Sequence, residues 1–181
     1  MKVSFPGIHQ RVNIPLVCET VKYLSANLGF SYPTAIDALH NASMPGRMTF
    51  TSDRTIIDGA HNPQAVETVV KNILHYFGKE KFMVIFGALK DKDVGTNLRH
   101  LAKIAKSFTF VNVRGARKSY SAEELLAKYE GVGMVGARTA ELIHAINDTS
   151  SPKLVIGSFY LAGDALKKYF STEEIINWRL K

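Results

Sequence analysis

The amino-acid sequence predicts an α/β fold in which a mostly parallel sheet lies between two layers of helices, preceded by a short helical segment. From Pro45 onward, short apolar runs alternate regularly with amphipathic stretches, which is typical of repeated strand–helix units. Most of these apolar runs are continuous in hydrophobicity, as expected of strands that are covered on both faces. Together the two observations predict a Rossmann-like three-layer sandwich.

The residues up to Gly46 predict two helices. The first is expected to begin near Asn13, whose side chain can cap a helix, and the proline two residues later is tolerated in a first turn. Thr34 to Leu39 predicts a second, shorter helix. Because two helices of this size bury little apolar surface by themselves, we expect residues 1–46 to pack on something else and residues 47–181 to form the main domain.

Strands and helices alternate through the main domain. The strand candidates are Thr55 to Asp58, Phe82 to Phe86, Phe108 to Val113, Val132 to Val135 and Leu154 to Ile156. The clearest helix is Pro63 to Phe77, because its apolar residues recur at helical spacing and Gly78 stands where a C-terminal cap belongs. Further helices are predicted after the capping box of Ser121 and Glu124, around Leu142 to Ile146, and after Gly157-Ser158.

Composition restricts the class of protein. The formal net charge of +7 indicates a surface that attracts anions, which could be nucleotides, carboxylate-rich substrates or nucleic acid. A single cysteine, Cys18, excludes an internal disulfide framework and a multi-cysteine metal site, so we expect a cytoplasmic protein. No run approaches the roughly 18 apolar residues of a membrane span, and no membrane partner is expected.

The stretch from Ile56 to Pro63 is the most informative, because an apolar strand leads directly into Asp58, a glycine, His61 and a helix-starting Asn-Pro. In open α/β sheets, ligands collect at the carboxyl ends of strands, where the next helix turns its unpaired N–H groups toward anions. Asp58 is suited to accept hydrogen bonds from ribose hydroxyls, His61 to donate to a phosphate or carboxylate oxygen, and Arg47 to bind phosphate. The alternative is a carboxylate that only caps the turn, beside an ordinary loop histidine. Their combination favours a nucleotide ligand.

Two nucleotide-binding motifs are absent or out of context. Gly131 to Gly136 matches the G-x-G-x-x-G pattern, but these glycines enclose a predicted strand instead of following it. The one Gly-Lys pair, Gly78-Lys79, is not followed by Ser or Thr and has no upstream glycine, so no P-loop is present. A nucleic-acid-binding module is disfavoured, because the basic residues are scattered and no recognised motif occurs.

Five segments, in this order, resemble the carboxyl-terminal region of folylpolyglutamate synthases and dihydrofolate synthases, which are members of the Mur ligase superfamily. They are Gly7-Ile8-His9-Gln10 with Asn13, Pro45-Gly46-Arg47, Asp58-Gly59-Ala60-His61-Asn62-Pro63, Gly87 to Asp93, and Gly157 to Leu161. The Asp-Gly-Ala-His-Asn-Pro block is specific to this family, and the others gain weight from their order. The resemblance covers nearly the whole chain.

This resemblance implies an ATP-dependent ligase that forms an acyl phosphate on a folate or dihydropteroate carboxylate, which the amino group of L-glutamate then attacks. By the same resemblance, the ATP contacts would be His9, Gln10, Asn13, Arg47, Asp58 and His61. Ser158 would help to bind the carboxylate of glutamate. Lys92 would contact an acyl phosphate or a carboxylate, although alternating charges after a strand are also typical of a solvated turn.

The chain lacks other parts that the resemblance implies. The P-loop, the magnesium ligands and the modified lysine of the family's central ATPase domain have no counterpart, and we expect the chain to begin at the end of that domain, as a monomer that is inactive alone. Ile14-Pro15 departs from the family pattern and makes the adenine contacts uncertain. No metal ligand is assigned. The choice between dihydrofolate synthesis, folate extension and both stays open.

Two alternatives and one further cluster remain. The chain could instead be an autonomous nucleotide-binding domain, or the carboxyl-terminal domain of a ligase that acts on cell-wall precursors. Arg114, Arg117 and Lys118 form a second basic cluster beyond a strand end. It is expected to be a solvated loop, or else to face a polyglutamate tail or the central domain.

Overall fold

The computed structural model describes residues 6–40, 42–115, 118–130, 136–148 and 152–178. The chain divides into two compact units, one comprising residues 1–44 with 177–181 and the other residues 45–176. No helix within the described ranges is long and apolar enough to span a membrane.

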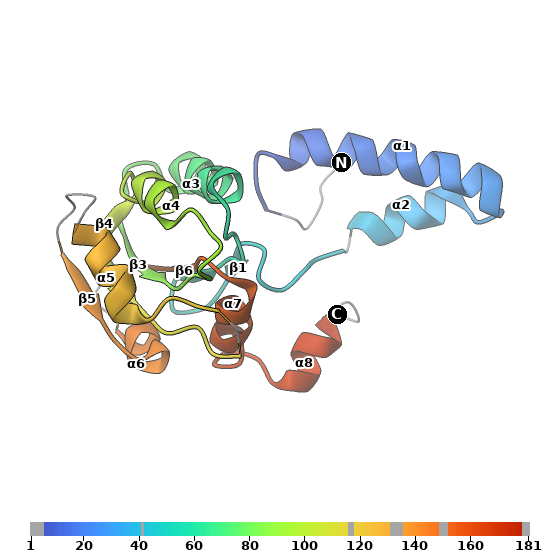
Figure 1. Cartoon of the computed structure of the whole chain (residues 1–181). Helices are drawn as coiled ribbons and strands as arrows, with labels where there is room; N and C mark the ends of the chain where they lie inside the picture. The colour runs from blue at the N-terminus through green and yellow to red at the C-terminus, as the bar shows by residue number, and fades with distance from the viewer. Residues whose placement is uncertain (1–5, 41, 116–117, 131–135, 149–151, 179–181) are drawn as a thin grey trace. The chain divides into compact units, whose positions relative to one another are not determined.

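The first unit contains two helices, α1 (Gln10–Leu28) and α2 (Tyr32–His40), which lie side by side (Figure 1). The prediction that Asn13 caps the first helix is wrong. The helix begins at Gln10, because the N–H groups of Gln10 and Asn13 already bond to the carbonyl oxygens of Gly7 and His9. Pro15 lies inside the helix, where its missing N–H removes one backbone hydrogen bond.

The second unit is built on a six-stranded sheet with the order β1-β2-β6-β3-β4-β5. The strands are β1 (Thr49–Phe50), β2 (Thr55–Ile57), β3 (Phe82–Phe86), β4 (Ala105–Phe110), β5 (Ala137–Thr139) and β6 (Lys153–Ile156). All neighbours pair in parallel except β1, which runs antiparallel to β2. The predicted mostly parallel sheet is confirmed.

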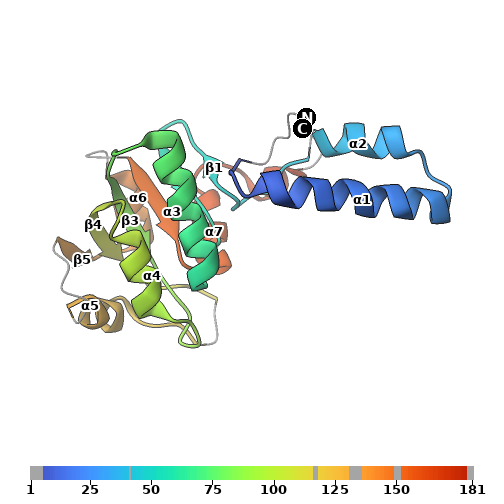
Figure 2. The ribbon, with the colours of Figure 1, turned by 90° about the horizontal axis from the view of Figure 1, so that it is seen from above.

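Helices cover both faces of this sheet. They are α3 (Pro63–Phe77), α4 (Val94–Leu101), α5 (Ala122–Glu130), α6 (Leu142–Asn147) and α7 (Phe159–Leu166). A short last helix, α8 (Thr172–Ile176), follows α7 and contains no buried residue. One core cluster joins the sheet to α3, α4 and α5, and another joins it to α6 and α7. Figure 2 shows α3 and α4 lying across the strands on one side. The three-layer sandwich is therefore confirmed.

Alternation along single strands produces the two cores. In β3, Val84 and Phe86 belong to the cluster beneath α3 and α4, whereas Met83 and Ile85 belong to the cluster with α6 and α7. Successive side chains of a strand point to opposite faces, so a strand that is buried on both sides must be apolar throughout. This explains the continuous apolar runs in the sequence.

The predicted boundaries are correct for β3 and α3 and displaced for β4. The ladder of β4 begins at Ala105, which pairs with Phe82, and ends at Phe110. Val111 and Val113 are buried although they lie beyond the end of β4. The apolar run from Phe108 to Val113 in the sequence therefore reflects the burial of these residues and does not mark where the strand begins and ends. The strand predicted at Val132 to Val135 lies outside the described residues.

A polar network closes the amino ends of β2 and β6. Lys153 is only 1% exposed, and its Nζ lies 3.6 Å from Oδ2 of Asp53 and donates to the carbonyl oxygen of Asp148 at 2.7 Å. The hydroxyl of Tyr169 donates to the same Asp53 oxygen at 2.8 Å. Burial tends to raise the pKa of Asp53, but hydrogen bonds from Thr51, Tyr169 and Thr55 and the charge of Lys153 together lower it strongly. Burial raises the pKa of Tyr169 to about 12, helped by its position beside Asp53.

Candidate functional site

The predicted site residues of the second unit follow the carboxyl ends of neighbouring strands. Asp58 and His61 follow β2, Ser158 follows β6, and Lys92 lies in the loop after β3. These three strands are adjacent in the sheet. Parallel strands bring their carboxyl ends to one edge, where ligands bind in open α/β folds.

Asp58 ties the backbone of this edge together. It is 5% exposed, its Oδ1 accepts the N–H of Ala60 at 2.7 Å, and its Oδ2 accepts the N–H of Met48 at 2.8 Å. Both oxygens therefore bond to backbone, as in the turn-capping alternative. The contact with a ribose stays a prediction.

His61 is oriented by its own turn. Its Nδ1 lies 3.0 Å from the carbonyl oxygen of Gly59, and a carbonyl oxygen can only accept, so Nδ1 carries the proton in this arrangement. While the ring is neutral, Nε2 is an acceptor. His61 can therefore donate to a phosphate oxygen through Nε2 only when the ring is doubly protonated, which is a condition that the sequence did not reveal.

Arg47 and His61 meet at a residue that was not predicted, Phe159. The guanidinium carbon of Arg47 lies 4.6 Å from the centroid of the Phe159 ring, a cation–π geometry. The His61 ring approaches the same ring edge-on, with 5.6 Å between centroids and an interplanar angle of 60°. Among the residues that the structure describes, Arg47 makes no ion pair. Its guanidinium is therefore available to an anion.

Ser158 is the N-cap of α7. Its Oγ accepts the N–H of Tyr160 at 3.2 Å, and the residue is 1% exposed. Because the oxygen is used as an acceptor, the hydroxyl hydrogen is what Ser158 has left to offer a carboxylate. Gly157, directly before it, has φ of 117°, and a Cβ there would lie 2.5 Å from the carbonyl oxygen of Gly87. A glycine is therefore required where β6 leads into α7.

The loop after β3 lies near the His61 turn. Lys92 is partly buried and its Nζ bonds to Oδ2 of Asp91 at 2.8 Å. The pKa of Asp91 is lowered, first by this hydrogen bond from Lys92 and in small part by the charge of His61. Asn97 of α4, which the sequence did not single out, donates from Nδ2 to the carbonyl oxygen of His61 at 3.1 Å.

The remaining predicted ATP contacts, His9, Gln10 and Asn13, belong to the first unit. They lie at the start of α1, where His9 occupies the N-cap position without a side-chain cap and Nδ2 of Asn13 lies 3.5 Å from Oε1 of Gln10. The helix therefore brings these three side chains onto one turn. Their contact with adenine stays a prediction.

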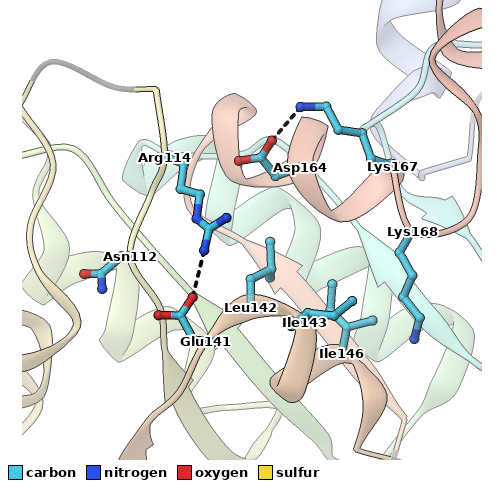
Figure 3. Close-up of a pocket in the computed structure, with 9 residues that line it drawn as sticks. All are labelled: Asn112, Arg114, Glu141, Leu142, Ile143, Ile146, Asp164, Lys167 and Lys168. Carbon is cyan, nitrogen blue, oxygen red and sulfur yellow. Dashed lines mark hydrogen bonds and ion pairs between the residues drawn. The ribbon is translucent and has the colours of Figure 1, made fainter.

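A separate cavity of about 420 Å³ lies beside α6 and α7 (Figure 3). Two of its cations pair with acidic side chains of the same cavity, Arg114 with Glu141 at 3.0 Å and Lys167 with Asp164 at 2.8 Å, and the third, Lys168, lies 3.7 Å from Asp53. Because these cations already have acidic partners, the cavity is a weaker candidate for an anion than the Arg47 site. Arg117 of the predicted basic cluster lies outside the described residues.

No metal centre is found within the described ranges, because no three His, Cys, Asp or Glu side chains gather there in a way that could hold an ion. The site instead offers one guanidinium, one imidazole, the ammonium of Lys92, a hydroxyl and the N-terminus of α7. This donor set fits anionic oxygens of phosphate or carboxylate groups.

Residues 46–157, more than half of the chain, match the family described as Mur ligase, glutamate ligase domain. The chain is 27% identical over 177 residues to the dihydrofolate synthase/folylpolyglutamate synthase of Bacillus subtilis, covering 93% of this chain and 41% of that protein.

Solved structures give the same picture. The folylpolyglutamate synthase of Mycobacterium tuberculosis complexed with ADP is similar with a TM-score of 0.74 and 25% identity, over 92% of this chain and 41% of that one. The bifunctional folylpolyglutamate synthase/dihydrofolate synthase of Yersinia pestis, with Mn, AMPPNP and L-glutamate bound, has a TM-score of 0.58 and 26% identity, over 73% of this chain and 33% of that one. The chain thus spans less than half the length of these relatives.

Proposed function

Because the chain belongs to the Mur ligase family by its glutamate ligase domain, we propose that it is the carboxyl-terminal part of an ATP-dependent ligase. That ligase adds L-glutamate to a folate or dihydropteroate through an acyl phosphate. The observation that carries this proposal is that Arg47 and His61 both contact Phe159. Phe159 directly follows Ser158 in the sequence, at the start of α7. Similarity to relatives bound to ADP, AMPPNP and L-glutamate supports it.

In this proposal, the chain supplies anion-binding groups to a reaction whose phosphate-gripping parts lie elsewhere. Arg47 and the protonated ring of His61 contact phosphate oxygens, and His9, Gln10 and Asn13 border the adenine. Phosphoryl transfer depends mainly on positioning and on stabilising the charge of the transferred group. A guanidinium held at the sheet edge serves both needs.

Ser158 and Lys92 are proposed for the glutamate side of the reaction. The Ser158 hydroxyl hydrogen and the N-terminus of α7 suit a carboxylate, and Lys92 suits a carboxylate or an acyl phosphate. A divalent cation, expected to be magnesium, would neutralise phosphate charge during transfer. Its ligands are assigned to the central domain of the parent polypeptide, and no role of the residues described above depends on it.

Two measurements test the proposal. The purified 181-residue chain should release no ADP when given ATP, glutamate and a folate or dihydropteroate. A chimera in which this chain replaces the matched 177 residues of the Bacillus subtilis enzyme should show glutamate-dependent ADP release.

In the chimera, Arg47→Ala and Ser158→Ala should reduce that release, the first through the phosphates and the second through a raised KM for glutamate. Turnover by the chain alone, or a soluble chimera that binds ADP but ignores glutamate, would contradict the proposal. Saturable micromolar ATP binding by the isolated chain would instead favour an autonomous nucleotide-binding domain.

A further inference from the structure

The ring of Phe159 lies at the surface of the second unit. Phe159 is the first residue of α7, and 44% of it remains exposed although it is a large apolar side chain. Single exposed apolar side chains are common on protein surfaces, so this exposure alone assigns no role to the ring. Here the ring lies over Gly59, where an added Cβ would overlap it. The absence of a side chain at residue 59 is therefore what lets the ring lie on the turn.

Arg47 and His61, the two phosphate contacts proposed for the second unit, both lie against this ring. Arg47 lies over its face and His61 meets it at an angle, while Nδ1 of His61 bonds to the carbonyl oxygen of Gly59, the same residue on which the ring lies. Arg47 comes from the turn before β1, His61 from the turn after β2, and Phe159 from the start of α7. Three segments that are distant in sequence thus meet at one aromatic ring.

We propose that Phe159 is a positioning residue: an aromatic platform that holds Arg47 and His61 on one face, so that they receive a phosphate group together. An arginine side chain has several rotatable bonds, and ordering it when a ligand arrives costs up to about 2 kcal/mol of rotamer entropy. A guanidinium that is already stacked on a ring has lost much of that freedom beforehand, so binding costs less.

The stacking of Arg47 and His61 on Phe159 does not depend on the proposed ligase function. The identification of the bound anion as a phosphate group does rest on that proposed function. The test therefore has one arm without any ligand and one with inorganic pyrophosphate as the probe. Phe159→Leu removes the aromatic face and keeps an apolar side chain, Phe159→Tyr restores the ring, and Tyr160→Leu is the control. Tyr160 is the adjacent exposed aromatic residue of α7, and among the described residues its ring contacts neither Arg47 nor His61.

In the first arm, NMR spectra of the purified chain should show the Arg47 side-chain resonances displaced by the ring current of Phe159. That displacement should vanish in Phe159→Leu, return in Phe159→Tyr and persist in Tyr160→Leu. Identical Arg47 and His61 resonances in the wild type and Phe159→Leu would overturn the platform. Unchanged amide spectra of the sheet residues would show that each variant is folded.

In the second arm, Phe159→Leu should weaken pyrophosphate binding about three- to tenfold, the range of a single cation–π contact, and Phe159→Tyr should restore it. Unchanged affinity in Phe159→Leu would overturn the positioning role. If the wild-type chain shows the NMR displacement but Arg47→Ala does not alter pyrophosphate binding, the stacking of Arg47 on Phe159 stands as a packing contact, and the positioning of Arg47 for a phosphate is overturned.

Discussion

The backbone N–H of Met48 donates a hydrogen bond of 2.8 Å to Oδ2 of Asp58, which joins the Arg47 turn to the end of β2. Met48 has φ of 45°, a conformation that residues other than glycine rarely adopt. A second bond, from the N–H of Gly59 to the carbonyl oxygen of Gly46 at 2.8 Å, fastens the same two segments. Such backbone conformations persist where the surroundings hold them, and Asp58 is one of the groups that do so.

Asp58→Asn should therefore loosen the Arg47 turn. An amide nitrogen must replace one of the two carboxylate oxygens, so one buried N–H, of Met48 or Ala60, loses its acceptor. We expect the free energy of unfolding to fall by about 1–3 kcal/mol, measured by urea denaturation. Asp93→Asn is the matched control, since Asp93 caps α4 and asparagine caps equally well. Equal stability of the two variants would contradict this role of Asp58.

Asn97 should be sensitive to charge as well as to size. Its Nδ2 donates to the carbonyl oxygen of His61, and the residue is fully buried. Asn97→Ala should lower the free energy of unfolding by about 1–3 kcal/mol, because the His61 carbonyl loses a donor. Asn97→Asp should cost more, since it turns a carboxylate toward that carbonyl oxygen, and its deficit should shrink as the pH is lowered. If Asn97→Asp were as stable as wild type at neutral pH, the hydrogen bond would not matter.

The stability of the chain should fall at both ends of the pH scale because of the network around Lys153. The pKa of Asp53 is lowered on folding, so its contribution is present above its unfolded value of about 3.9 and is lost as the pH falls below that value. The pKa of Tyr169 is raised to about 12, so its contribution is present below about pH 10 and is lost as the pH rises toward 12. Thermal denaturation across the pH range measures both limbs.

Asp53→Asn should flatten the acid limb and Tyr169→Phe the alkaline limb. At neutral pH, Asp53→Asn should also lower the free energy of unfolding by roughly 3 kcal/mol, because it leaves the buried ammonium of Lys153 without its carboxylate partner. Asp164→Asn is the control, since its ion pair with the exposed Lys167 lies within one helix turn at the surface. If the stability of Asp53→Asn fell at low pH as steeply as that of the wild type, Asp53 would not be the cause of the acid sensitivity.

Two glycines of the same region should respond in opposite directions to alanine. Gly157→Ala places a Cβ 2.5 Å from the carbonyl oxygen of Gly87 at a φ of 117°, and should lower the free energy of unfolding by about 3 kcal/mol or more. Gly163→Ala, inside α7, meets no atom within 4 Å and should stabilise the chain by about 0.5–1 kcal/mol. Denaturation curves of both variants measure these changes in the free energy of unfolding. An unchanged free energy of unfolding in Gly157→Ala would show that the turn can shift to accept a Cβ.

The sequence predicted those parts of the fold in which local pattern and tertiary packing agree. The apolar stripe and caps of α3 and the apolar run of β3 gave correct boundaries. α4 was not predicted, because Gly95, Asn97 and His100 interrupt its apolar spacing and it is packed in place by its neighbours. β1 is too short to leave a pattern, since its two residues depend on pairing with β2.

The sequence predicted those residues of the candidate site whose side-chain type indicates ligand binding. It missed the residues whose role depends on which segments lie beside them in the fold. Arg47, His61 and Ser158 stand in recognisable motifs at strand ends. Phe159 and Asn97 do not carry ligand chemistry themselves, and their contacts join segments that are about a hundred and about forty residues apart in the chain. No local pattern encodes such contacts. The adjacency of Gly59 and Phe159 emerges only when β2 and β6 pair.

Strands β2 and β6 carry different groups at their two ends. The polar network lies at the amino ends and consists of Asp53, Lys153 and Tyr169. The predicted site residues Asp58, His61 and Ser158 lie at the carboxyl ends. Because β2 and β6 run parallel, the amino ends of both strands carry the polar network and their carboxyl ends carry the predicted site residues. The acid resistance of this unit can therefore be tuned from the amino ends without touching the predicted site residues, whereas substitutions of Asp58 or Gly157 at the carboxyl ends alter its stability as well.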